Sequence, residues 1–204
     1  MKAILFIILF FLKTSLIAQL NFLDKKMRKY EIDYKGSQKI MLLKKSDVFY
    51  GEVVNYITKY GKTTKTISEQ IEIKEQIAKK LLFELYKIGL DSLNVVNCVF
   101  LPGMSSMEEI EDCIKKYGDN KNCLDGTYTS IKIQVNDSIR KFGFDCLSKD
   151  EKIDSTTLKR RRQALKALRL IDKELNLDEL KKKFKEKLGK GTYGGEGNYF
   201  IKIR

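Results

Sequence analysis

The chain has 204 residues, of which 33% are charged, and its lysines and arginines exceed its acidic residues by 13. This length is sufficient for one domain with a substantial core, and the single proline, Pro102, argues against a proline-rich linker. Histidine is absent. This excludes Ser-His-Asp and Cys-His catalysis and histidine-ligated metal sites.

The first 18 residues have the layout of a secretory signal peptide. Lys2 forms a short positive region, residues 3–12 are uninterruptedly apolar, and the small residue Ala18 precedes Gln19. Lys13 ends the apolar run well before the length of about 20 residues that a membrane span needs. A retained N-terminal anchor is the alternative. We therefore predict export to the periplasm or the extracellular space, and a single domain over residues 19–204.

The four cysteines form an even set, which in an exported protein predicts disulfide bonds. Three pairings are open, and the sequence does not choose among them. A structural zinc site is the weaker alternative because the close C-x2-C pairs of such sites are absent. Reduced, buried thiols are the other alternative. The candidates are Cys98, Cys113, Cys123 and Cys146.

The first third of the chain predicts an antiparallel meander. Residues 29–35, 39–43 and 48–58 are rich in alternating or β-branched apolar residues, with a turn at Gly36-Ser37 and a polar break at 44–47. Gly51 suggests a bulge in the third strand. Thr66 and Glu69 fit a capping box, which predicts a helix from Thr66 that Gly89 ends.

The rest of the chain predicts a central hairpin between helices. Residues 94–101 are expected to form a strand, 105–118 a short helix, and 121–146 a hairpin with a turn at Asn136-Asp137. Helices follow over 155–173 and from Asn176, which Glu179 would cap, and residues 198–203 form a last strand. The predicted fold is α+β, an antiparallel sheet packed against three to four helices.

Acidic side chains cluster on the short helix, namely Glu108, Glu109, Glu111 and Asp112. Paired carboxylates can hydrolyse glycosides or bind calcium, but acidic residues in a first helical turn stabilise any helix. The glycine-rich residues 189–197 do not match a phosphate-binding loop, since they follow a helix and precede a strand. We therefore expect no catalytic residue, metal or cofactor, and residues 189–197 stay a candidate functional loop through Tyr193.

Two basic runs give the C-terminal helices a strong positive charge. They form a candidate surface for an anionic partner, such as lipid headgroups, anionic glycans or an acidic protein, with a solvated helix face as the alternative. Nucleic acid is disfavoured because no aromatic residues interleave the runs. The residues are Lys159, Arg160, Arg161, Arg162, Lys181, Lys182 and Lys183.

Several stretches carry a resemblance to a known family: the Ala18-Gln19 junction, FYGEVVNYITKY, LYKIGLDSLNVV, CLDGTYTSIKI and LGKGTYGGEGNYFIKI. In these the chain resembles a family of small exported bacterial proteins of uncharacterised activity. The resemblance implies an α+β fold and transfers no functional residue.

Two classes of function remain. The first is an exported binding or interaction protein, of which an immunity-type inhibitor of a delivered toxin is one version. The second is a carboxylate-dependent hydrolase of cell-wall or glycan material.

Overall fold

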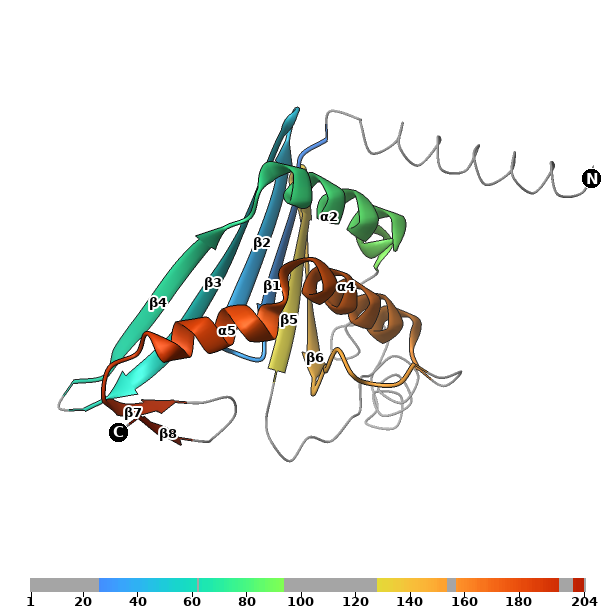
Figure 1. Cartoon of the computed structure of the whole chain (residues 1–204). Coiled ribbons are helices and arrows are strands. Elements are labelled where there is room, and N and C mark those ends of the chain that lie inside the picture. The colour runs from blue at the N-terminus through green and yellow to red at the C-terminus, as the bar shows by residue number, and fades with distance from the viewer. Residues whose placement is uncertain (1–25, 62, 94–127, 154–156, 195–199, 204) are drawn as a thin grey trace, which may run out of the picture.

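The structure is a computed structural model that describes residues 26–61, 63–93, 128–153, 157–194 and 200–203. It is an α+β fold in which an eight-stranded antiparallel sheet curls into a half-barrel around three helices (Figure 1). The predicted fold class is confirmed.

The N-terminal meander is confirmed as β1 (Arg28–Tyr34), β2 (Gln38–Lys45) and β3 (Val48–Tyr60). Lys35 and Gly36 join β1 to β2 with φ values of 51° and 61°, a left-handed conformation that glycine adopts without strain. A fourth strand, β4 (Lys65–Glu72), pairs with β3 on its other side.

The central hairpin consists of β5 (Tyr128–Val135) and β6 (Ser138–Asp145), and β5 pairs with β1. Asn136, at φ 52°, opens the predicted turn. Two short strands, β7 (Gly191–Gly194) and β8 (Phe200–Ile203), continue the sheet beyond the end of β2. The sheet order is β6-β5-β1-β2-β3-β7-β8, with β4 added to β3.

The helices within the described ranges are α2 (Glu75–Lys87), α4 (Lys159–Leu175) and α5 (Leu177–Glu186), with a 3-10 turn at Leu90–Ser92. As predicted, Gly89 follows the end of α2, at φ 80°. Asn176 caps α5 as expected: its side chain accepts a hydrogen bond from the backbone N–H of Glu179 at 3.3 Å. All three helices lie against one face of the sheet (Figure 1).

The core fills the space between this face and the helices. Alternate side chains of the strands are buried there, including Tyr30 and Ile32 of β1 and Ile131 and Ile133 of β5. They pack in one cluster with the apolar stripes of α2 and α4, which are Ala78, Leu81, Leu82, Leu85, Ala164, Leu165, Ala167, Leu168 and Ile171. A second cluster joins Ile57, Phe184 and Tyr193 near α5.

Two local predictions in the first half of the chain differ from the structure. Thr66 and Glu69 lie in β4 rather than at a helix start, because residues 65–72 pair with β3, and α2 begins only at Glu75. Gly51 is regularly paired with Leu42, so it marks no bulge. A methyl group at Gly51 would lie 3.0 Å from Leu42 Cδ2 and 3.1 Å from Ile73, which explains the need for glycine.

The predicted loop at 189–197 is in part a strand, since Gly191–Gly194 pairs with the end of β3. Tyr193 is fully buried, and its hydroxyl donates a hydrogen bond to the Gly189 carbonyl at 2.6 Å. Its role here is therefore in packing.

Several predictions lie outside the described residues: the signal peptide, the strand at 94–101, the helix at 105–118 with its acidic cluster, and Cys98, Cys113 and Cys123. In the described part of the chain, no helix combines the length and the apolar character that crossing a bilayer requires.

Candidate functional site

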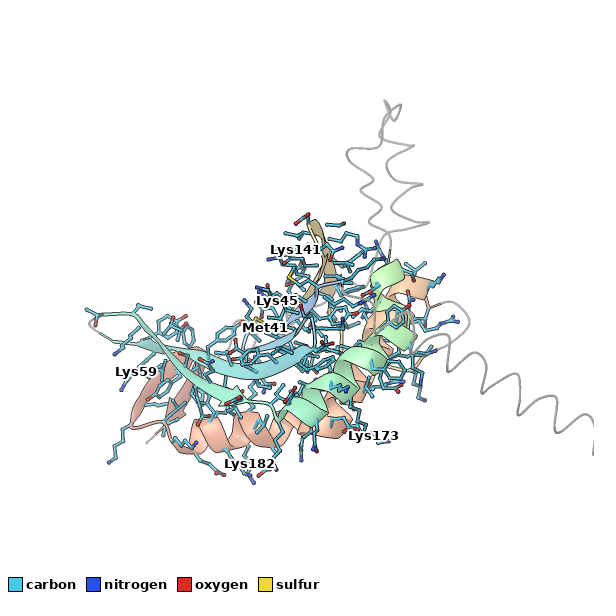
Figure 2. The ribbon with its side chains drawn as sticks, turned by 90° about the horizontal axis from the view of Figure 1, so that it is seen from above. Met41, Lys45, Lys59, Lys141, Lys173 and Lys182 are labelled. Atoms are coloured by element: carbon cyan, nitrogen blue, oxygen red, sulfur yellow. The ribbon has the colours of Figure 1, made fainter. Side chains whose placement is uncertain are left out.

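The face of the sheet away from the helices is here called the outer face. The strand registers place one set of alternating side chains on it, and among the described residues no helix covers it. Figure 2 shows Met41, Lys45 and Lys141 on this side. Its central residues are Lys29, Glu31, Asp33, Lys39, Met41, Leu43, Tyr50, Glu52, Val54, Tyr56, Ser130, Lys132, Gln134, Ile139 and Lys141.

Large apolar side chains are exposed on the outer face. Five such residues are between 42% and 68% exposed, and the strand registers put all of them on this face: Val48, Tyr60, Tyr128, Ile139 and Phe200. Tyr60 and Phe200 pack edge to face with ring centroids 5.2 Å apart. Tyr60 and Phe200 therefore form an exposed apolar patch at this end of the outer face, and exposed apolar patches are typical of interaction surfaces.

The centre of the outer face carries an ionic cluster around Glu31. Its carboxylate lies 2.7 Å from Lys29 Nζ, 3.1 Å from Lys39 Nζ and 3.4 Å from Lys132 Nζ. Partial burial raises the pKa of Glu31, but the hydrogen bonds from Lys29 and Lys39 outweigh burial and lower it to about 2. Glu31 is therefore ionised at neutral pH, and its ion pairs link β1, β2 and β5.

Two tyrosines of β3 are fixed by carboxylates. The Tyr56 hydroxyl donates to Asp33 Oδ1 and the Tyr50 hydroxyl to Glu52 Oε2, both at 2.5 Å. Burial and the bond to Asp33 raise the pKa of Tyr56, and the bond to Glu52 raises the pKa of Tyr50. Both hydroxyls stay protonated at neutral pH. Their rings are therefore held in place by these hydrogen bonds.

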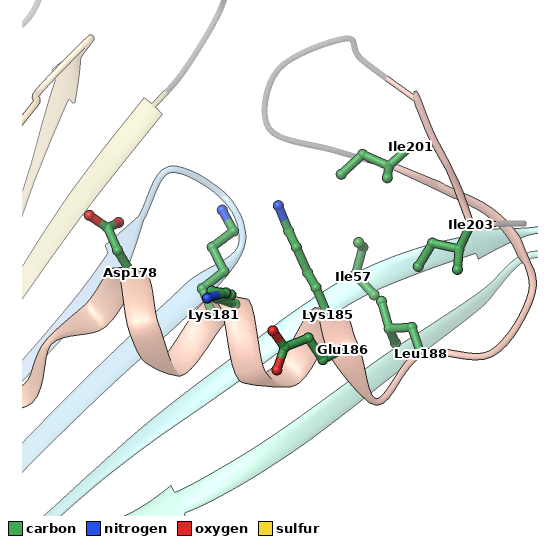
Figure 3. A pocket seen from close by; sticks show the side chains of 9 residues that line it. Ile57, Asp178, Lys181, Lys185, Glu186, Leu188, Ile201 and Ile203 are labelled. Atoms are coloured by element: carbon green, nitrogen blue, oxygen red, sulfur yellow. The ribbon is translucent and has the colours of Figure 1, made fainter.

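A second candidate site is a pocket of about 550 Å³ between α5, the end of β3 and β8, here called the α5 pocket. Figure 3 shows its apolar residues, Ile57, Leu188, Ile201 and Ile203, together with charged side chains of α5. The charged residues are Asp178, Lys181, Lys182, Lys185 and Glu186.

The structure does not gather the two predicted basic runs into one surface. The first begins at the N-terminus of α4 and the second lies on α5, apart from it (Figure 1). Lys159 is exposed, whereas Arg160 and Arg162 are half-buried. Lys181 and Lys182 line the α5 pocket, and the exposed Lys183 forms an ion pair with Glu179 at 3.7 Å.

Arg161 differs most from the expectation of a surface residue. Its side chain is buried and forms two bonds to Glu151, from Nε at 2.8 Å and from Nη2 at 2.6 Å. Nη2 also donates to the Cys146 carbonyl at 3.3 Å. The guanidinium therefore joins α4 to the segment after β6 and is not available to a partner.

Of the predicted disulfide cysteines, the described residues include Cys146, which is half-buried directly after β6. The described part of the chain contains no free cysteine. It also contains no group of three or more histidine, cysteine or acidic side chains arranged to hold a metal ion.

The site residues predicted from the sequence include none of the charged and aromatic residues on the outer face. The sequence did contain a signal for this face: Tyr50, Tyr56 and Tyr60 stand at even-numbered positions of β3, and these alternate positions point to the outer face. The α5 pocket had no comparable signal, because it depends on β8 lying beside α5.

Comparison with protein-family models, curated proteins and solved structures finds no match to this chain. The resemblance to a family of exported proteins stays a prediction.

Proposed function

We propose that this chain is an exported, non-catalytic binding protein whose outer face binds an acidic protein partner. The observation that carries the proposal is that, among the described residues, the five exposed large apolar side chains all lie on that face. Fixed tyrosines and half-buried apolar residues near the centre of a polar surface are typical of protein interfaces.

The charge distribution favours an acidic partner over a second copy of the chain. Removal of Lys2 and Lys13 with a signal peptide would lower the net charge from +13 to +11, so two copies still repel each other. On the outer face, Lys39, Lys132 and Lys141 lie on β2, β5 and β6. Acidic groups of a partner can pair with these lysines while its apolar residues cover Met41.

Export and disulfide bonding are part of the proposal. The half-buried position of Cys146 and the absence of a free cysteine among the described residues support a cross-link from Cys146 to another of the four cysteines. An immunity-type inhibitor is a special case in which the partner is a toxin. The hydrolase stays a prediction, since its acidic cluster lies outside the described residues.

The test is capture of the partner from the cell-envelope fraction by the purified protein at about 0.1 M and about 1 M salt, where the Debye length falls from about 10 Å to about 3 Å. Ile139→Glu adds one negative charge to the outer face, and Gln76→Glu adds the same charge to an exposed position on α2. We expect one protein to stay bound at high salt and Ile139→Glu to weaken its binding at least about tenfold, with Gln76→Glu unchanged.

Three results would overturn the proposal. Loss of all binding at high salt would leave only diffuse charge attraction. Equal binding by both variants would place the interface elsewhere. A dimer in analytical ultracentrifugation that Ile139→Glu dissociates would show that the outer face binds a second copy.

A further inference from the structure

We propose that the α5 pocket binds an alkyl carboxylate, a linear acyl chain that ends in a free carboxylate. This site goes beyond the proposed function because it lies on the helix side of the sheet, whereas the partner is expected on the outer face.

The floor of the pocket is apolar and rests on the smaller core cluster. Ile57 of β3 is 7% exposed and packs with Phe184 and Tyr193, while Leu188 and Ile203 pack against the same cluster from the end of α5 and from β8. Ile201 completes the wall on the β8 side (Figure 3). An acyl chain can therefore replace water along a surface formed by four branched aliphatic side chains.

The rim of the pocket is positively charged. Lys181, Lys182 and Lys185 contribute three ammonium groups, and in the described part of the chain Lys182 and Lys185 have no carboxylate partner. The carboxylate of Asp178 lies 2.6 Å from Lys149 Nζ, and this contact compensates its charge. Glu186 adds one negative charge, so the rim has an excess of cations that a ligand can neutralise.

The geometry also fixes one of the lysines near the opening. Lys181 Nζ donates to Ser37 Oγ at 2.8 Å, which anchors its side chain across to the β1–β2 turn. Figure 3 shows Lys181 and Lys185 extending from α5 on the same side of the helix, with Ile57 beyond Lys185. A ligand that satisfies both parts of the site needs an anionic head at the lysines and an apolar tail toward Ile57 and Ile203.

These two requirements select the ligand class. A small inorganic anion leaves the aliphatic floor in contact with water, and a neutral or cationic amphiphile brings no carboxylate to Lys182 and Lys185. The volume of about 550 Å³ lies within the range of about 300–1,000 Å³ that is usual for small-molecule sites.

Isothermal titration calorimetry with hexanoate, octanoate and decanoate, each below its micelle concentration, tests the proposal. We expect one site per chain, with affinity rising about fourfold for each added methylene, the factor that corresponds to about 0.8 kcal/mol per buried CH2. Decanol and decyltrimethylammonium, which have the same chain without the negative charge, should bind at least about tenfold more weakly than decanoate.

Variants of α5 locate the site. Lys182→Gln/Lys185→Gln should weaken decanoate binding at least about fivefold while leaving decanol binding unchanged, because only the charged head has lost its partners. Lys183→Gln is the matched control, since Lys183 is on the same helix but does not line the pocket. All three positions are exposed or half-buried, so the variants are expected to fold.

Each of four outcomes would overturn the inference. Affinity that does not depend on chain length would show attraction to charge alone, and equal binding of decanol would show an unspecific apolar surface. An effect of Lys183→Gln equal to that of the double variant would place the ligand elsewhere. Binding to vesicles of anionic phospholipid without binding to monomeric decanoate would show a membrane surface as the source of the ligand.

Discussion

Replacement of Asp91 by alanine should destabilise the protein more than any surface substitution. Asp91 lies in the 3-10 turn after α2 and accepts hydrogen bonds from Arg28 Nε at 3.0 Å and from the Tyr30 hydroxyl at 2.5 Å. Arg28 is 3% exposed. Loss of the Asp91 carboxylate would leave a buried guanidinium without this counter-charge and a buried phenol without its acceptor.

The expected magnitude follows from these contacts. Removal of one partner of a buried ion pair costs about 3–5 kcal/mol. The side chain of Asp91 is 17% exposed, and Arg28 keeps a cation–π contact 5.0 Å from the Tyr86 ring centroid, so the lower part of this range applies. We expect Asp91→Ala to reduce the free energy of unfolding by about 3 kcal/mol.

Urea denaturation followed by circular dichroism measures this loss, and a double-mutant cycle assigns it to the ion pair. In an Arg28→Met background, where no guanidinium loses the Asp91 counter-charge, Asp91→Ala should cost only about 1 kcal/mol. A loss of equal size in both backgrounds would refute the reasoning, since it would show that Asp91 and Arg28 are not coupled.

Three further results are expected. Glu31→Gln should remove a part of the folding stability that depends on acid. The lowered pKa of Glu31 corresponds to at most about 3 kcal/mol in the free energy of unfolding. Because the lysines around Glu31 are exposed to solvent, we expect a contribution of only about 1 kcal/mol. This contribution is present above pH 4.5 and is lost as the pH falls to about 2, so urea midpoints of the native protein and the variant should converge there. Tyr193→Phe should lower the free energy of unfolding by about 1 kcal/mol, measured in the same assay, because the bond to the Gly189 carbonyl is lost. Iodoacetamide should label no cysteine of the native protein before reduction and all four cysteines afterwards; labelling of Cys146 without reductant would contradict the proposed disulfide.

Sequence patterns predicted those helices and strands correctly whose local side-chain pattern favours the same structure as their contacts with the rest of the fold. Tyr30 and Ile32 alternate with charged residues, and both are buried under the helices. Gly89 and Asn176 satisfy backbone requirements of the helix ends themselves, so their signals do not depend on the rest of the fold.

The prediction failed where a distant partner decides the structure. Thr66 and Glu69 satisfy the pattern of a helix cap, but pairing of residues 65–72 with β3 outweighs this local preference. The glycines of β7 suggested a loop, whereas they make room for side chains of β3. A methyl group would lie 2.8 Å from Lys59 Cε at Gly191 and 3.0 Å from the Tyr60 ring at Gly194.

The candidate sites could be predicted only in part, for the same reason. Lys181 and Lys182 were recognised from their charge, but the apolar floor beside them depends on β8, which the register with β7 places there. Arg161 was read as a surface charge because nothing in the sequence pairs it with Glu151, and it is their bidentate contact that makes burial of the guanidinium tolerable.

Strand β3 belongs to two cores, since Phe49 and Val53 pack in the large cluster while Ile57 packs in the small one. The small cluster has three buried members and is closed by the short strands β7 and β8. Amide hydrogen exchange along this one strand therefore reports two opening free energies, a global one near Val53 and a smaller, local one toward Tyr60. A ligand in the α5 pocket would slow exchange only at the second of these, so a single strand provides both the probe and its internal reference.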